Sequence, residues 1–109
     1  MKVFEAQERL ALRAITLPCP DREIEGGYVG DLLSWVMGRV NENDAWITIM
    51  SNINIAAVAS LADVACVILA EGVTLDEEVI ATANQKNINI LSTDLSAFDI
   101  CVRLSELIR

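Results

Sequence analysis

Two apolar stretches near the middle of the chain lack the alternation of polar and apolar residues that marks a half-exposed strand. They are Trp46–Met50 and Val64–Ala70, and an alanine-rich segment that begins at Ser51–Asn54 lies between them. Uninterrupted apolar runs of this length are typical of parallel strands buried on both faces. The intervening segment is as long as one short helix, so the pattern predicts a right-handed strand-helix-strand unit.

The pattern continues toward the C-terminus with the same alternation of element types. Residues 74–86 and 95–108 carry apolar positions at helical spacing, and Ile88–Leu91 between them is a short apolar run. Thr74 followed by Glu77 has the spacing of a capping box, which predicts where the first of these helices begins. The resulting order of strands and helices predicts an α/β fold in which helices cover both faces of a mostly parallel sheet.

The first third of the chain predicts shorter elements. Residues 3–12 have helical spacing, and residues 13–17 and 27–30 have the composition of brief strands. We expect these two strands to extend the sheet at an edge, where antiparallel pairing is also available to them. Asp31 is a good N-cap residue and predicts the start of a helix that runs to Val40.

The helix of this first third has an unusually wide apolar face. Leu32, Leu33 and Val36 are expected to face the core. Trp35 and Met37 add apolar area beyond that face, and a large exposed apolar patch is unusual for a monomer. These two residues are therefore the candidate interface of a homodimer.

The composition sharpens this picture, because 53% of the residues are hydrophobic and the mean hydropathy is +0.41. So high an apolar fraction indicates either a membrane segment or a core combined with a subunit interface. The candidate membrane span, Ile53–Ala70, contains Asn54 and Asp63, and a central aspartate costs about 2.5–3.5 kcal/mol on insertion scales. We therefore expect a single domain over residues 1–109 that stays out of the membrane and self-associates.

Charge and cysteine content narrow the classes of function further. The net charge is −8 and the pI is near 4.3, which argues against nucleic acid as a partner because phosphate backbones attract basic surfaces. The three cysteines are widely spaced and the charged N-terminus MKVFEAQER lacks a signal-peptide pattern, so we expect reduced thiols and a cytoplasmic protein. Histidine is absent and no CxxC pair occurs, so we expect no metal site, no cofactor and no histidine-based catalysis.

Candidate chemistry lies where the predicted strands end. In open α/β sheets, ligands bind beyond the carboxyl ends of the strands, and three segments would meet there: Ser51–Asn54, Ala70–Gly72 and Ser92–Asp94. The first begins a helix, whose free N–H groups favour an anion such as a phosphate. Simple capping of the helix by Ser51 and Asn52 explains these residues as well. The candidate ligand-binding residues are Ser51, Asn52, Asn54, Glu71, Gly72, Thr93 and Asp94.

Glu71 and Asp94 offer a second kind of chemistry. Paired carboxylates act as general acid and base only when they lie close together in unequal environments. Exposed, solvated carboxylates are the simpler explanation of these two residues, and no nucleophile with an adjacent base is recognisable. No catalytic residue is therefore assigned.

The sequence around these segments resembles the DRTGG domain family. The resemblance is carried by GGYVGDLLSWVM (26–37), WITIMSNINIAAVA (46–59), VACVILAEGVTLDEEVIATA (64–83) and INILSTDLSAFD (88–99). It implies a three-layer α/β/α sandwich around a mixed sheet, related to the N-terminal domain of HPr kinase, frequently dimeric and regulatory rather than catalytic. Members of the family occur alone or attached to other modules, such as those of CBS-containing pyrophosphatases and phosphotransacetylases.

The residues that give the family its name are mostly replaced in this chain. The family's Asp-Arg aligns with Ser51 and Asn52, and its Thr-Gly-Gly aligns with Ala70, Glu71 and Gly72, so only Gly72 is retained. The arginine that would clamp a phosphate with two hydrogen bonds is absent from this alignment. We therefore expect the shared edge of the sheet to lack positive charge.

Three functions are compatible with these observations. The first is a stand-alone regulatory module that forms a homodimer and binds a protein partner or a small ligand, such as a nucleotide or another small anion. The second is a structural subunit of a larger complex, whose apolar surplus is covered by a different chain. The third is an enzyme for a small polar substrate that uses Glu71 and Asp94. We favour the first, because no catalytic constellation is recognisable and the resemblance implies regulation.

Overall fold

Three parallel strands, buried along their whole length, form the centre of the molecule. The structure, a computed structural model, describes residues 1–108. β3 (Asp44–Thr48), β4 (Cys66–Leu69) and β5 (Ile90–Ser92) lie side by side, and every residue in them is buried. β3 pairs with β4 and β4 pairs with β5, both in parallel. The predicted succession of buried parallel strands is therefore confirmed.

The two short strands of the N-terminal third lie at opposite edges of this sheet. β2 (Gly26–Val29) pairs in parallel with β3, and β1 (Arg13–Thr16) pairs antiparallel with β5. The strand order is β1-β5-β4-β3-β2, so the sheet is mixed and each short strand takes a different edge. Because β1 runs against its neighbour, it begins where the parallel strands end, and Arg13 lies opposite Ser92.

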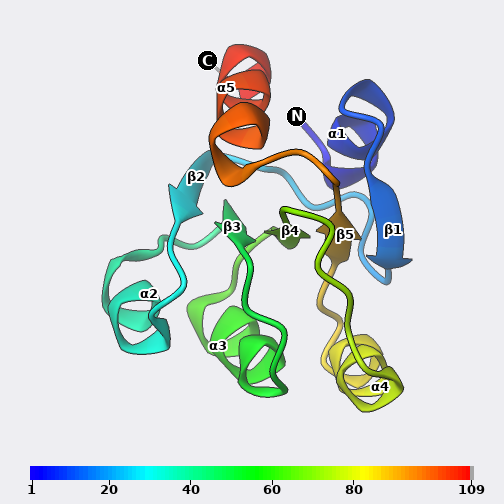
Figure 1. The fold of residues 1–109 in the computed structure, drawn as a ribbon, viewed down its shortest axis with the longest axis vertical. Coiled ribbons are helices and arrows are strands. Elements are labelled where there is room, and N and C mark those ends of the chain that lie inside the picture. Colours follow the sequence, from blue (N-terminus) through cyan, green and yellow to red (C-terminus); the bar gives the residue numbers. More distant parts are fainter. Residues whose placement is uncertain (109) are drawn as a thin grey trace.

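Helices cover both faces of the sheet and complete a three-layer α/β/α sandwich (Figure 1). α1 (Val3–Arg9) and α5 (Ala97–Ile108) lie on one face. α2 (Leu33–Arg39), α3 (Asn54–Ala62) and α4 (Glu77–Gln85) lie on the other. No helix within residues 1–108 combines the length and the apolar character that crossing a membrane requires.

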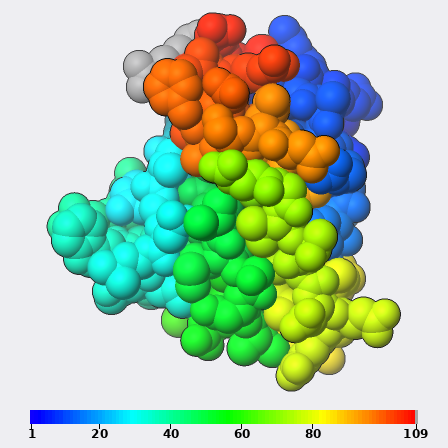
Figure 2. Space-filling model, viewed as in Figure 1, coloured from blue at the N-terminus to red at the C-terminus, as the bar shows by residue number. Residues whose placement is uncertain are grey.

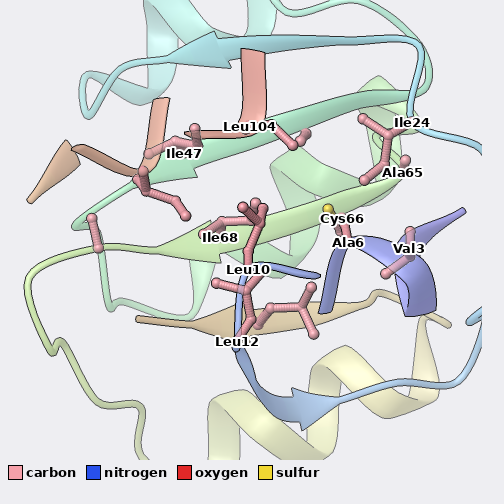
Figure 3. Packing of buried hydrophobic residues seen from close by; sticks show 14 residues of the cluster. Val3, Ala6, Leu10, Leu12, Ile24, Ile47, Ala65, Cys66, Ile68 and Leu104 are labelled. Carbon is pink, nitrogen blue, oxygen red and sulfur yellow. The ribbon is translucent and has the colours of Figure 1, made fainter. Parts of the chain in front are cut away.

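The sheet separates two apolar cores, because successive side chains of a strand point to opposite faces. Figure 3 shows side chains of α1 and α5, such as Ala6 and Leu104, gathered around Ile47, Cys66 and Ile68 of the central strands. The core on the opposite face includes Val36, Trp46, Ile55, Val58, Val67, Leu69, Val79, Ala83 and Ile90. Burial on both faces is the reason why the central strands show no polar-apolar alternation in the sequence.

Two predicted helix starts are wrong in the structure. α4 begins at Glu77 with Asp76 in the N-cap position and no side-chain cap, so Thr74 does not form a capping box. α2 begins at Leu33 with Leu32 in the N-cap position, and Leu32 is exposed rather than part of the core. The Asp31 carboxylate does not cap α2. Its Oδ1 accepts hydrogen bonds from Thr48 Oγ1 at 2.8 Å and from the Ile49 N–H at 3.0 Å.

Candidate functional site

The segments that follow the parallel strands meet at one edge of the sheet. Thr48 is opposite Leu69, and Leu69 is opposite Ser92, so the chain leaves these three neighbouring strands at the same level. Figure 2 views the molecule onto this edge, with the segments after β3, β4 and β5 in green, lime and orange. The three candidate segments therefore share the carboxyl edge, as expected from their positions in the sequence.

Two of the three segments are joined by backbone hydrogen bonds. The Glu71 N–H donates to the Leu95 carbonyl at 2.8 Å, and the Gly72 N–H donates to the Thr93 carbonyl at 2.9 Å. Both Glu71 and Gly72 have positive φ, at 63° and 72°. A β-carbon on Gly72 would lie 3.2 Å from Asp94 Oδ1, so the turn and the aspartate approach each other closely. The structure thus brings Glu71, Gly72, Thr93 and Asp94 together.

The third segment, Ser51–Asn54, forms a local turn at the start of α3. Asn52 Oδ1 accepts a hydrogen bond from the Asn54 N–H at 2.8 Å, so its side chain serves the turn itself. All four residues are exposed, and Asn54 therefore needs no buried partner. Among residues 1–108, no hydrogen bond links this turn to the two joined segments. Ile53 occupies the N-cap position of α3 and makes no side-chain cap, so Ser51 and Asn52 are not the N-cap, and the Asn52 side chain stabilises the turn that precedes the helix.

Arg13 is a further candidate residue at this edge, and the sequence pattern did not predict its place there. Its guanidinium donates from Nη2 to Asp94 Oδ1 at 2.8 Å and from Nη1 to Asp94 Oδ2 at 3.3 Å, and its Nε–H donates to Ser92 Oγ at 3.2 Å. The expectation that this edge lacks positive charge is therefore wrong. No local pattern marks Arg13, because it reaches the edge only through the antiparallel direction of β1.

This ion pair favours the ionised form of Asp94. The hydrogen bonds from Arg13, and then its positive charge, lower the pKa of Asp94 below the ordinary value of 3.8. The same two effects, exerted by the carboxylate, raise the pKa of Arg13. A general acid near neutral pH needs a raised pKa, so Asp94 is poorly suited to donate a proton there. The geometry therefore does not favour Glu71 and Asp94 as a catalytic pair.

Burial makes two of the three cysteines poor nucleophiles. Cys19, Cys66 and Cys101 are free thiols in the structure. Burial raises the pKa of the Cys66 thiol to about 12, and burial also raises the pKa of Cys101. Because the thiolate is the nucleophilic form, both are poor nucleophiles. Within residues 1–108, no group of three or more histidine, cysteine, aspartate or glutamate side chains is arranged to hold a metal ion.

A hollow of about 310 Å³ opens beside Arg13. It lies between β1, the segment that leads into α4, and α4 itself, and its lining residues are Arg13, Ala14, Ile15, Val73, Thr74, Leu75, Ile80 and Ser92. A second hollow of about 280 Å³ lies between β2 and α5 and is lined by residues such as Gly27, Val29, Cys101 and Leu104. Only the first adjoins the charged cluster at the carboxyl edge.

A mixed sheet between two layers of helices, with a charged cluster at the ends of its parallel strands, defines a small three-layer α/β domain with a candidate site at its carboxyl edge. The family model of the DRTGG domain matches residues 29–107 of this chain. The chain therefore belongs to the DRTGG domain family. No curated protein matches it significantly in sequence.

A similar fold is found in the crystal structure of the CBS and DRTGG domains of the regulatory region of Clostridium perfringens pyrophosphatase, complexed with activator, diadenosine tetraphosphate. The TM-score is 0.69, with 20% sequence identity over 98% of this chain. The match covers 45% of that chain, so the present chain corresponds to less than half of its neighbour. At this identity the likeness establishes the fold.

Proposed function

We propose that this chain is a non-catalytic regulatory module that binds a small anionic ligand of the nucleotide class at the carboxyl edge of its sheet. We further propose that it acts as a homodimer in the cytoplasm. The observation that carries the ligand proposal is the Arg13 guanidinium, which lies at this edge beside the hollow of about 310 Å³. Ligand pockets have volumes from about 300 Å³ upward, so the hollow is large enough for part of a nucleotide.

Arg13 is suited to exchange its present partner for a phosphate. A guanidinium binds carboxylates and phosphates with the same pair of parallel hydrogen bonds. The side chains of Arg13 and Asp94 are 59% and 78% exposed, and exposed ion pairs are weak because water screens them. A phosphate group that displaced Asp94 would therefore gain the two-pronged contact at small cost.

The comparisons support the ligand class and the regulatory role. The structural neighbour is described as a regulatory region complexed with a dinucleoside polyphosphate activator. Membership of the DRTGG family supports regulation rather than catalysis. In this proposal, Arg13 provides from β1 the positive charge that the replaced family residues at positions 51 and 52 do not provide.

Thermal unfolding in the presence of nucleotides tests the ligand proposal. Diadenosine tetraphosphate, ATP and AMP are added separately to the wild-type chain, and a ligand at a hundred times its Kd should raise the Tm by about 10 °C. Arg13→Gln should weaken that binding about tenfold to a hundredfold, because a charge-assisted contact is lost. Arg9→Gln removes another exposed arginine and should leave the affinity unchanged.

Two results would overturn this part of the proposal. One is the absence of any rise in Tm with all three nucleotides. The other is equal affinity of the wild type and Arg13→Gln, which would place the ligand elsewhere on the molecule.

A further inference from the structure

The outer side of α2 carries large apolar side chains that the protein's own fold leaves uncovered. Leu32 is 59% exposed and Trp35 is 54% exposed. The Arg39 guanidinium carbon lies 3.9 Å from the centroid of the Trp35 ring, so these two residues share one side of the helix. Met37 is two positions from Trp35, which is about 200° around a helix, so it projects from the opposite side. Trp35 and Met37 therefore cannot both belong to one flat interface.

Neither the backbone conformation nor the packing of a single copy requires glycine at position 38 in α2. Gly38 lies in the last turn of α2, and glycine in a helix costs up to about 1 kcal/mol relative to alanine. Gly38 does not have positive φ, and a β-carbon placed on it would meet nothing within 4 Å. The missing side chain therefore serves neither the backbone conformation nor the packing of this copy. It leaves bare backbone beside Trp35, where another chain can approach closely.

The charges of α2 are arranged so that a second copy complements the first. Asp31 precedes the helix and Arg39 is its last residue, with apolar side chains between them. When two such helices pack antiparallel about Trp35, the basic end of each meets the acidic beginning of the other. Asp31 uses only Oδ1 for its hydrogen bonds to Thr48 and Ile49, which leaves Oδ2 for a partner. A two-fold contact requires this kind of self-complementary surface.

We propose that α2 is the contact between two copies of this chain, packed antiparallel about a two-fold axis at Trp35. Each indole lies against the bare backbone at Gly38 of the other copy, and each Arg39 pairs with Asp31 of the other copy. This inference rests on the homodimer of the proposed function and names its surface. Figure 2 shows the segment around α2 as a projecting lobe, accessible to another molecule.

The size of the surface sets the strength of the contact. α2 has only seven residues, whereas stable interfaces bury about 800 Å² on each partner. The exposed side chain of Val29 on the adjacent β2 enlarges the apolar surface only slightly. We therefore expect a reversible dimer with a Kd of about 1–100 μM, rather than an obligate one.

Sedimentation equilibrium of the full chain from about 1 to 300 μM measures this Kd directly. Gly38→Leu fills the space beside Trp35 and should weaken the dimer at least about tenfold, while the Tm of the monomer stays at or above the wild-type value. Arg39→Glu should weaken the dimer by a similar factor. Arg103→Glu on α5 is the matched control, because it makes the same change in net charge at another exposed arginine and should leave the Kd within about twofold.

The outcomes separate this inference from the proposed function. A wild-type dimer whose Kd is the same in Gly38→Leu and Arg39→Glu would overturn the α2 contact and leave the homodimer standing. Equal weakening by Arg39→Glu and Arg103→Glu would also overturn it, since net repulsion alone would then explain the effect. A wild-type chain that stays monomeric up to 300 μM would overturn the homodimer together with its surface. The nucleotide-dependent rise in Tm would still test the ligand site independently.

Discussion

Arg13 and Asp94 join two parts of the chain that are 81 residues apart in sequence. The pair lowers the pKa of Asp94, so its carboxylate stays ionised at all but strongly acidic pH. A group whose pKa is lowered by folding stabilises the folded state above its unfolded pKa, and this contribution is lost as the pH falls through the folded pKa. The contribution is therefore fully present at neutral pH, and its loss is confined to acid, below about pH 4.

Arg13→Gln should raise the pKa of Asp94 toward 3.8, because the hydrogen bonds and the charge of the guanidinium are both removed. Carboxyl carbon chemical shifts, followed by NMR from pH 2 to pH 6, give this pKa directly. Arg9→Gln should leave the titration of Asp94 unchanged. An Asp94 midpoint that is the same in wild type and Arg13→Gln would show that the pair does not persist in solution.

The buried side chain of Asn89 holds the loop between β1 and β2 in place through the backbone of Cys19. Its Oδ1 accepts from the Cys19 N–H at 2.9 Å, and its Nδ2 donates to the carbonyls of Cys19 and Ala65 at 2.7 and 3.0 Å. Asn89→Ala should lower the free energy of unfolding by about 1–3 kcal/mol, because buried backbone groups lose their partners. Urea denaturation measures this loss. Asn84→Ala, at an exposed position on α4, should change it by less than about 0.5 kcal/mol.

The positions of single residues were predictable from the sequence where those residues directly follow a buried strand. Glu71, Gly72 and Asp94 follow buried strands, and the structure places them together. Arg13 was not predictable in this way, because its position depends on the direction of an edge strand that pairs with residues far away in the sequence. The prediction that Asp31 caps α2 was wrong for the same reason. Thr48 and Ile49, which lie far from Asp31 in the sequence, donate hydrogen bonds to its carboxylate, and the helix does not.

The turn at Glu71 and Gly72 is the element that holds the two halves of the candidate site together. Both residues have a left-handed backbone conformation, and the N–H group of each donates a hydrogen bond to the segment after β5. Gly72→Ala should lower the free energy of unfolding by about 1–2 kcal/mol, because a β-carbon strains this conformation and crowds Asp94. Gly38→Ala provides the contrast, since its φ is not positive and its surroundings are open, and it should raise stability by up to about 1 kcal/mol.

Urea denaturation of the two alanine variants decides between these expectations. If Gly38→Ala lost as much stability as Gly72→Ala, the space available for a side chain, rather than the backbone conformation, would determine the effect of alanine at both positions.

At the level of elements, long-range burial was easier to predict than local helix starts. The apolar runs specify β3 and β4 because strands buried on both faces tolerate few polar residues. Helix starts depend on competition for individual side chains, and the sequence shows only the local candidates. Thr74 and Glu77 have the spacing of a capping box, yet the helix begins three residues after Thr74, with extended backbone at Asp76.

The molecule as a whole should unfold in one step. Its two cores lie on opposite faces of one sheet, and β3, β4 and β5 contribute side chains to both, so neither core can persist without the other. In Trp35→Phe, the remaining tryptophan is Trp46, which is fully buried. Its fluorescence and the far-ultraviolet circular dichroism should give the same urea midpoint. Two separate midpoints would show that one helical layer is lost before the sheet.

The layered architecture was predictable because alternating strands and helices leave few alternatives. The positions of β1 and β2 at opposite edges were not, since both are short and carry weak patterns that fit either edge. The family model begins at residue 29, so it likewise leaves these two strands unmatched for most of their length.

The reversed direction of β1 has a consequence for how such modules diversify. If Arg13 binds the ligand as proposed, a change in this edge strand can alter the ligand preference of the domain while the interior strands and both cores stay intact. Under that proposal, selection can alter ligand specificity through one edge strand. Relatives that differ in ligand should therefore differ first at the position equivalent to Arg13.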